Sequence, residues 1–319
     1  MSEPGTSAVG RRRFDGPPRI ALEPLGARDW LADAIEAGGG KVVAPPDSEA
    51  LVWASPSATE ELADLVAQLG PALHWVQLPW AGIEPFVGVL DHDHLWTCGK
   101  GIYAEPVAEH ALALALGGLR SLATYARARA WAPPQGRNLL GARVVVIGAG
   151  GIAESFLRLL APFRCHVTVV RRRPTPFAGA ERTISLDELD SALPTADLVV
   201  IAAALTPETR GVIDARRLAM LPSHAWVLNV GRGGHIVTDD LVAALAAGSI
   251  GGAALDVTDP EPLPADHPLW TSPRCLITPH VGNTPEMAVP LLSERVTANV
   301  GRFAATAPLI GVVDVDAGY

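Results

Sequence analysis

Three side chains in the last third of the chain have the types that reduction of a carbonyl group requires: Arg232, Glu261 and His280. A guanidinium can hold carboxylate and carbonyl oxygens, and an imidazolium can donate a proton to the reacting oxygen. A carboxylate beside the imidazole keeps that ring charged. Together the three groups suit the reduction of a 2-keto acid to a 2-hydroxy acid, or the reverse reaction.

Each of these residues follows an apolar run that predicts a β-strand. The relevant runs are Ala225–Val230 before Arg232, Gly252–Val257 before Glu261 and Cys275–Thr278 before His280, with a further one at Asp197–Ala203. Nearly continuous apolar character is typical of parallel strands that are covered on both faces. Ligands bind outside the carboxyl ends of the strands in open α/β sheets, so we expect the three side chains to converge there.

The stretch from Arg143 to Arg173 predicts a strand, a glycine-rich turn, a helix and a second strand. Its strands are VVVI at 144–147 and VTVV at 167–170, and its turn, GAGGIA at 148–153, carries the G-x-G-x-x-G/A pattern. Gly148 permits the tight turn, Gly150 lets a pyrophosphate approach the backbone, and Ala153 lets the helix pack near the strand. We therefore predict a dinucleotide site at this turn, with Gly151 and Ile152 adding N–H groups at the start of the helix.

The residues after the second strand indicate which dinucleotide binds. About 20 residues beyond such a turn, NAD-binding proteins usually have an acidic residue that contacts the ribose hydroxyls. This chain has Arg171, Arg172 and Arg173 instead. Guanidinium groups can bind a ribose 2′-phosphate bidentately, and a carboxylate would repel it. We predict NADP(H) as the cofactor, held by Arg171 and Arg172, with NAD as the alternative; the competing interpretation is three solvated arginines in a surface loop.

The chain before the dinucleotide unit alternates short strands with helices, which predicts a parallel, doubly wound sheet. The expected strands are Ile20–Leu22, Lys41–Ala44, Leu51–Ala54 and His74–Leu78, and the expected helices are Ala27–Ala37 and Thr59–Leu69. Later helices are expected at Pro106–Leu119, Asp239–Ala247 and Pro285–Ala304. The predicted fold class is α/β, with a flavodoxin-like substrate domain and a Rossmann dinucleotide-binding domain.

The domain boundaries follow from these elements. We expect a flexible leader at residues 1–17, a substrate domain at 18–104 and 285–319, and a dinucleotide-binding domain at 105–284. The active site should then lie in the cleft between the two domains.

Composition excludes several other classes of protein. The chain has 319 residues, of which 49% are hydrophobic, and a net charge of −9, so no basic field invites nucleic acid. Its three cysteines, Cys98, Cys165 and Cys275, include no pair spaced as in a metal or redox motif. No apolar run approaches membrane-spanning length and no signal region is evident. We expect a cytoplasmic enzyme without a metal or a membrane partner.

Motifs along the chain occur in an order that resembles one known family. They are VAEH at 107–110, VIGAGGI at 146–152, LTPETRG at 205–211, NVGRGG at 229–234, ALDV at 254–257 with EPL at 261–263, and TPHVG at 278–282. This order is similar to that of the D-isomer-specific 2-hydroxyacid dehydrogenases, and of their glyoxylate/hydroxypyruvate reductases in particular. The resemblance covers nearly all of the chain beyond the leader.

The resemblance implies a role for each matching residue. Arg232 would bind the substrate carboxylate and polarise its C2 carbonyl, His280 would be the general acid/base, and Glu261 would be its partner. Further residues are expected to line the site: Trp80, Ala81, Gly82 and Tyr103 for the substrate, and Leu205, Thr206, Val230 and Asp256 for the cofactor. The family also implies a homodimer formed through the dinucleotide-binding domain. We expect Trp131 to pack in the core rather than to cap a site across that interface.

Two alternative functions are open at this point. One is a nucleotide-sensing, non-catalytic binding protein on the same scaffold, as transcriptional corepressors of the superfamily are. The other is oxidation of formate or a similar one-carbon acid. Relatives of the second kind typically carry an amide where Glu261 stands, so this carboxylate argues against that chemistry.

Overall fold

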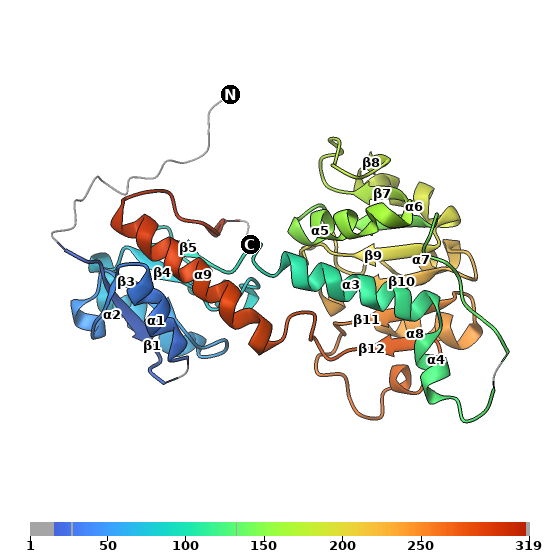
Figure 1. Ribbon diagram of the computed structural model, residues 1–319, viewed down its shortest axis with the longest axis horizontal. Helices are drawn as coiled ribbons and strands as arrows, with labels where there is room; N and C mark the ends of the chain where they lie inside the picture. The colour runs from blue at the N-terminus through green and yellow to red at the C-terminus, as the bar shows by residue number, and fades with distance from the viewer. Residues whose placement is uncertain (1–15, 27, 132, 317–319) are drawn as a thin grey trace. The chain divides into compact units, whose positions relative to one another are not determined.

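The structure is a computed structural model that describes residues 16–26, 28–131 and 133–316. Most of the expected leader, residues 1–15, lies outside the described residues. By its packing the chain divides into two compact units. The first runs up to Tyr103 and resumes at Pro285, and the second spans Ala104–Thr284. Figure 1 shows the first unit in blue and red and the second in green to orange.

The first unit is built on a parallel sheet with the strand order β2-β1-β3-β4-β5. Its strands are β1 Arg19–Glu23, β2 Lys41–Val42, β3 Ala50–Trp53, β4 Trp75–Gln77 and β5 Leu95–Thr97. Its helices are α1 Trp30–Ala37, α2 Thr59–Leu69 and α9 Pro285–Ala304. The strand order is the flavodoxin-like one. Helix α9 returns from the far end of the chain to pack on α1, because Val296 and Val300 are buried in one cluster with Leu31 and Ile35.

The second unit contains a seven-stranded parallel sheet with the order β12-β11-β10-β9-β6-β7-β8. Its strands are β6 Arg143–Ile147, β7 His166–Val170, β8 Arg182–Ile184, β9 Leu198–Ile201, β10 Trp226–Asn229, β11 Gly252–Leu255 and β12 Cys275–Ile277. Its helices are α3 Ala104–Leu119, α4 Leu122–Arg127, α5 Gly151–Leu160, α6 Leu189–Ala192, α7 Ala215–Met220 and α8 Thr238–Ala247. The predicted α/β class with two doubly wound parallel sheets is confirmed.

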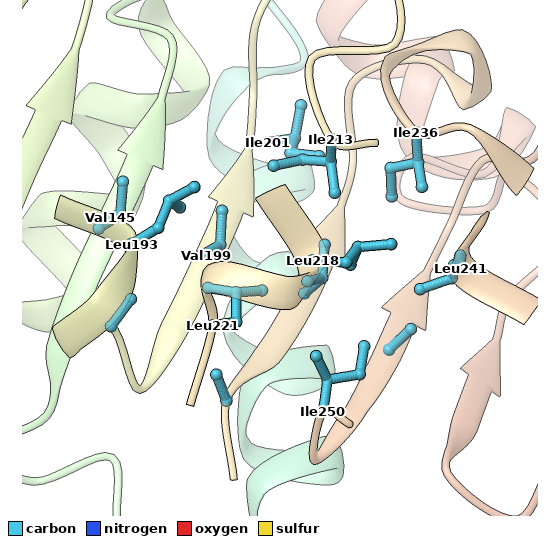
Figure 2. Packing of buried hydrophobic residues seen from close by; sticks show 14 of the residues in the cluster. Val145, Leu193, Val199, Ile201, Ile213, Leu218, Leu221, Ile236, Leu241 and Ile250 are labelled. Carbon is cyan, nitrogen blue, oxygen red and sulfur yellow. The ribbon is translucent and has the colours of Figure 1, made fainter. Parts of the chain in front are cut away.

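Each face of the second sheet has its own apolar core, because successive side chains of a strand point to opposite faces. Val144 and Val146 of β6 are buried with residues of α3 and α5 on one face. Val145 of the same strand is buried on the other face with Leu218 of α7 and Leu241 of α8. Figure 2 shows this second cluster, in which Val145, Leu218 and Leu241 are labelled. Both faces are covered, which explains the nearly unbroken apolar runs of the central strands.

Some elements differ from the expectations drawn from the sequence. Strands β5 and β8 and helices α4, α6 and α7 were not predicted, because each is short and lacks a clear apolar period. Helix α5 begins at Gly151 and therefore includes the last three residues of the glycine-rich turn. The expectation that Trp131 packs in the core is wrong, since its relative exposure is 103%. None of the helices in the described ranges is long and apolar enough to cross a membrane.

Candidate active site

The carboxyl ends of three neighbouring strands place the predicted chemical groups at one edge of the second sheet. Strands β12, β11 and β10 lie side by side, and their last residues are in register, with Asn229 opposite Leu255 and Leu255 opposite Ile277. The segments that carry Arg232, Asp256 and His280 therefore leave the sheet at the same edge, as parallel pairing requires.

His280 and Glu261 form a close pair at this edge. His280 Nδ1 lies 2.6 Å from Glu261 Oε1, and the two side chains are 50% and 42% exposed. A carboxylate at this distance from Nδ1 fixes the orientation of the imidazole ring. With Nδ1 engaged by Glu261, the ring nitrogen that can face a substrate is Nε2. The pair predicted from the sequence is thus brought together by the fold.

The backbone of His280 is held in a conformation that is unusual for a residue with a side chain. Its φ is +54°, in the left-handed region. The His280 N–H donates to the backbone carbonyl of Asp256 at 2.7 Å. The next two N–H groups, of Val281 and Gly282, each donate to the Asp256 carboxylate at 2.9 Å. Asp256 therefore fixes the turn that presents the imidazole.

Asp256 is the centre of a buried hydrogen-bond network. Its relative exposure is 3%, and its carboxylate also accepts from Thr278 Oγ1 at 2.6 Å and lies 3.2 Å from His110 Nε2. Burial by itself would raise the pKa of this carboxyl. The hydrogen bonds from His110, Thr278, Val281 and Gly282 outweigh that effect and lower the pKa to about 2. The group is an anion that these four partners hold in place.

His110 is a member of this network that the sequence marked only as the end of the VAEH motif. It lies on α3, and its Nε2 is 2.9 Å from Thr278 Oγ1. Through Thr278 and Asp256 it ties the long helix to the turn that carries His280. No local pattern could have revealed this contact, because the two residues are 168 positions apart in the chain.

The turn that carries Arg232 is supported by two buried polar residues, Asn229 and His235. Asn229 Nδ2 donates to the Arg232 carbonyl at 2.8 Å, and His235 Nδ1 lies 3.1 Å from the Arg232 backbone nitrogen. Burial lowers the pKa of His235, so the ring is neutral at pH 7. At Gly233 a Cβ atom would lie 1.9 Å from the Thr258 carbonyl oxygen, so no side chain fits. The Arg232 guanidinium is turned back onto this fixed backbone, since its NH1 donates to the Gly231 carbonyl at 2.8 Å.

The glycine-rich turn has the shape that a pyrophosphate needs. Gly148 has a φ of +116°, and a Cβ there would lie 2.4 Å from the Ala202 carbonyl oxygen, so only glycine fits. Gly150 is the residue before α5, and no atom lies within 4 Å of the position its Cβ would take. This open space adjoins the first N–H groups of α5, beginning with Gly151 and Ile152. The residues present therefore fit a dinucleotide phosphate.

The segment after β7 carries positive charge and no acid. Residues 171–180 read RRRPTPFAGA. The Arg171 guanidinium lies 5.8 Å from the centre of the Phe177 ring, and its backbone N–H donates to the Ile184 carbonyl at 3.0 Å. A carboxylate for the ribose hydroxyls of NAD is absent from these residues, so the site is chemically suited to a 2′-phosphate.

The other residues expected at the cofactor follow neighbouring strands of the same sheet. Leu205 and Thr206 lie after β9, where the Thr206 N–H donates to Thr209 Oγ1 at 2.8 Å and the Thr206 hydroxyl donates to Glu208 at 2.7 Å. Val230 directly follows β10 and is 5% exposed. The loop after β9 is therefore held by its own side-chain hydrogen bonds.

In the first unit, the loop Trp80–Gly82 follows β4 at the carboxyl edge of its sheet. The rings of Trp80 and Tyr103 have their centres 6.4 Å apart. The Tyr103 hydroxyl is buried without a hydrogen-bond partner among the described residues, and burial raises its pKa to about 12. Arg28, which the sequence did not single out, has its guanidinium carbon 4.2 Å from the centre of the Trp80 ring.

A dinucleotide cradle with a cation and an imidazole–carboxylate pair at the same sheet edge defines a dinucleotide-dependent oxidoreductase. The family model for the NAD binding domain of D-isomer specific 2-hydroxyacid dehydrogenases matches residues 110–282 of this chain. The chain belongs to the D-isomer specific 2-hydroxyacid dehydrogenase family.

Several relatives match over most of their length. An uncharacterized protein of Corynebacterium melassecola, from the region 3′ of proB, is 36% identical over 293 residues, which are 89% of this chain and 95% of that protein. The glyoxylate/hydroxypyruvate reductase A of Yersinia enterocolitica is 29% identical over 290 residues, which are 86% of this chain and 88% of the reductase. These matches support the enzyme interpretation over the sensor alternative.

Solved structures of the same family are also similar to this chain. The D-isomer specific 2-hydroxyacid dehydrogenase of Xanthobacter autotrophicus Py2, in complex with NADPH and MES, matches 95% of this chain and 100% of its own with a TM-score of 0.80 and 27% identity. The NADPH-dependent glyoxylate/hydroxypyruvate reductase of Sinorhizobium meliloti, in complex with NADP and sulfate, has the same coverage and identity, with a TM-score of 0.77.

Proposed function

We propose that this protein reduces a short 2-keto acid to a D-2-hydroxy acid, or catalyses the reverse reaction, with NADP(H). The observation that carries the proposal is the 2.6 Å contact between His280 and Glu261 at the sheet edge that also bears Arg232 and the dinucleotide turn. Family membership supports the same chemistry, and the glyoxylate/hydroxypyruvate reductases among the relatives support a small substrate.

The proposed roles follow from the chemistry of each side chain. Arg232 binds the substrate carboxylate and polarises the C2 carbonyl. His280 donates a proton from Nε2 to the carbonyl oxygen, and Glu261, its partner in the acid–base pair, holds the ring through Nδ1. A reduced nicotinamide, when bound, supplies the hydride. In the reverse direction, the neutral imidazole of His280 accepts the hydroxyl proton.

The proposed substrate loop is Trp80–Gly82 in the first unit, with backbone N–H groups directed to the substrate carboxylate and Tyr103 nearby. The first unit, including α9, is proposed as the substrate domain, and the second as the dinucleotide-binding domain. This division assigns substrate selection to one unit and the acid–base pair to the other.

NADP(H) is proposed over NAD because Arg171 and Arg172 stand where an acid would bind the ribose hydroxyls. The complexes of the Xanthobacter and Sinorhizobium relatives with NADPH and NADP support this choice. The phosphates are assigned to Gly148, Gly150, Gly151 and Ile152, and the remaining cofactor contacts to Leu205, Thr206, Val230 and Asp256.

A cytoplasmic homodimer formed through the second unit is proposed as well. Its support is a set of large apolar side chains that the monomer leaves exposed: Leu122 at 56%, Trp131 at 103% and Leu140 at 50%. Light scattering coupled to gel filtration tests the assembly, and a monomer mass at micromolar concentration would rule the dimer out. Replacement of Trp131 by Glu should weaken association if this surface forms the interface.

The decisive experiment is a matrix of NADPH and NADH oxidation against glyoxylate, hydroxypyruvate, pyruvate and phenylpyruvate, with chiral analysis of each product. The proposal expects turnover with NADPH and a D-product. Binding of NADPH without turnover of any keto acid, by a folded protein, would contradict it and favour a nucleotide sensor.

A further inference from the structure

His235 is a fully buried histidine between two loops of the second unit, and its relative exposure is 0%. Its Nδ1 lies 3.1 Å from the Arg232 backbone nitrogen, and its Nε2 lies 3.2 Å from the Ala204 carbonyl oxygen. Arg232 follows β10, Ala204 follows β9, and these two strands are neighbours in the sheet. The imidazole therefore bridges two segments that leave the sheet side by side at its carboxyl edge.

The Ala204 carbonyl also holds the loop after β9 in shape. It accepts a hydrogen bond from Thr209 Oγ1 at 2.8 Å, and Thr209 Oγ1 accepts one from the Thr206 N–H at 2.8 Å. A carbonyl oxygen has two lone pairs, so it can accept from Thr209 and from His235 together. A continuous hydrogen-bond path can therefore run from the Thr206 backbone through His235 to the Arg232 backbone.

The position of the ring proton decides whether this path is complete. Burial lowers the pKa of His235, so its ring carries a single N–H. With the proton on Nε2, the ring donates to Ala204 and Nδ1 accepts the Arg232 N–H. With the proton on Nδ1, the ring would donate to the Arg232 carbonyl, 2.8 Å away, which already accepts from Asn229 Nδ2. The Arg232 N–H would then lose this acceptor, and Nε2 would face the Ala204 oxygen without a hydrogen, so the surroundings favour Nε2–H.

Backbone contacts hold the same two loops tightly together. The Gly211 N–H donates to the Gly234 carbonyl at 2.8 Å. At Gly231 a Cβ atom would lie 3.0 Å from the Ala203 carbonyl oxygen and 3.1 Å from Cε1 of His235, so the turn before Arg232 packs directly on the residues after β9. In such close packing, a shift of one loop displaces the other.

We propose that His235 is a positioning residue that couples cofactor binding at the loop after β9 to substrate binding by Arg232. The inference rests on the proposed function, which assigns Thr206 to the cofactor and Arg232 to the substrate carboxylate. A cofactor that contacts Thr206 fixes the loop and with it the Ala204 carbonyl. Because His235 joins that carbonyl to the Arg232 backbone, the bound cofactor also fixes the turn that presents the guanidinium. The coupling is reciprocal, so a bound substrate strengthens cofactor binding by the same factor.

Two substitutions of His235 break the hydrogen-bond path at opposite ends. In His235→Asn the amide reaches the position of Nδ1, so it keeps an acceptor for the Arg232 N–H and loses the Ala204 carbonyl. In His235→Gln the amide reaches the position of Nε2, so it keeps a donor to Ala204 and loses the acceptor for Arg232. His224→Gln is the matched control, because His224 precedes β10 at the opposite edge of the sheet and pairs with Asp197 at 2.8 Å. Thermal unfolding shows whether each variant is folded.

The measurement is the Kd of oxamate, a 2-keto acid analogue that is not reduced, by calorimetry with and without saturating NADPH. NADPH should tighten oxamate binding by wild type. Both His235 variants should lower that factor about fivefold, as loss of one hydrogen bond predicts, and His224→Gln should leave it unchanged. Without NADPH, only His235→Gln should bind oxamate more weakly than wild type, because only that change releases the Arg232 turn. The same NADPH effect in wild type and both His235 variants, or no NADPH effect in wild type, would overturn the coupling.

A spectroscopic measurement on the wild-type protein depends neither on turnover nor on the folding of a variant. Long-range proton–nitrogen correlation spectra of protein with 15N-labelled histidine distinguish the two ring tautomers, and the His235 signal is the one absent from His235→Gln. A proton on Nε2 at pH 7 supports the hydrogen-bond path, and a proton on Nδ1 would overturn it. The spectra and the oxamate titrations decide the role of His235 even if no keto acid is reduced, so failure of this inference and failure of the proposed function are distinguishable.

Discussion

Asp256 holds His280 through the backbone and the carboxylate together. The His280 N–H donates to the Asp256 carbonyl at 2.7 Å, and the carboxylate accepts the N–H groups of Val281 and Gly282 that follow. This arrangement compensates the left-handed backbone of His280, whose φ is +54°. The turn that carries the imidazole is therefore held from the segment after the neighbouring strand β11 as well as by its own Thr278 carbonyl, which lies 3.0 Å from the His280 nitrogen.

Replacement of Asp256 by Asn should destabilise the protein and lower its activity. The amide offers an N–H where the N–H groups of Val281 and Gly282 need acceptors, and we expect a loss of about 1–3 kcal/mol in the free energy of unfolding. Urea denaturation at pH 7 and kcat/KM measure the two effects. Glu60→Gln, an exposed change on α2, is the control. An Asp256→Asn protein as stable and active as wild type would refute the anchoring role.

The same carboxylate predicts how stability depends on pH. Its folded pKa, about 2, is below the ordinary value of 3.8, so its stabilising contribution is complete above pH 3.8. The contribution is lost as the pH falls from about 4 toward 2, where the folded form also takes up the proton. The difference in unfolding free energy between wild type and Asp256→Asn should therefore shrink over that window. A constant difference from pH 7 to pH 3 would contradict the assignment.

Replacement of His110 by Ala should lower kcat while leaving NADPH affinity nearly unchanged. His110 Nε2 lies 2.9 Å from Thr278 Oγ1, and Thr278 in turn donates to Asp256, which holds the turn that carries the His280 imidazole. Loss of one hydrogen bond with a net contribution of about 1 kcal/mol should lower kcat roughly fivefold. His110→Asn, which can restore a donor, should recover part of the rate. If both variants kept wild-type kcat, His110 would have only a packing role.

Replacement of Glu261 by Gln tests the acid–base pair itself. The His280 imidazolium would lose the carboxylate 2.6 Å away, so reduction should fall by about 10²-fold. The measurement is kcat/KM for reduction at pH 7, with NADPH binding as the control for folding. A Glu261→Gln protein as active as wild type would remove Glu261 from this role.

Replacement of Arg171 by Asp should reverse the preference between the two cofactors. The carboxylate would repel a 2′-phosphate and accept hydrogen bonds from a ribose, so KM for NADPH should rise at least about tenfold relative to that for NADH. Arg173→Asp, two residues further along the same segment, serves as the matched control with the same change in charge. An equal effect of both substitutions would indicate a general electrostatic effect of the added negative charge rather than a specific contact between Arg171 and the 2′-phosphate.

Two glycines of the dinucleotide turn should respond differently to alanine. At Gly148 the new Cβ would lie 2.4 Å from the Ala202 carbonyl oxygen in a backbone with φ of +116°, so Gly148→Ala should cost about 1–3 kcal/mol of stability. Gly150→Ala meets no atom within 4 Å and should fold normally, but its methyl group would occupy the space assigned to the phosphates. Thermal unfolding and NADPH titration separate the two cases. Normal NADPH binding by Gly150→Ala would contradict the assignment of the cofactor phosphates to this turn.

The fold class could be predicted from the sequence because it depends on local patterns. The apolar runs at 144–147 and 167–170, with the glycine spacing between them, specify a βαβ unit whatever surrounds it. The carboxyl-edge rule then selects Arg232, Glu261 and His280 as candidates. Strands β5 and β8 escaped prediction because each has three residues that are only partly apolar, unlike the equally short edge strand β12, whose residues Cys275–Ile277 are all apolar.

The contacts that tune the site depend on the tertiary structure alone. His110 reaches Thr278 across 168 positions of sequence, and Arg28 reaches the Trp80 ring from the segment that follows β1. No sequence spacing predicts either contact, because side-chain distances between separate elements depend on how sheets and helices pack. The sequence by itself determined which groups can perform the chemistry. Packing decided which of them meet, since only the folded sheet edge brings distant segments within hydrogen-bond range.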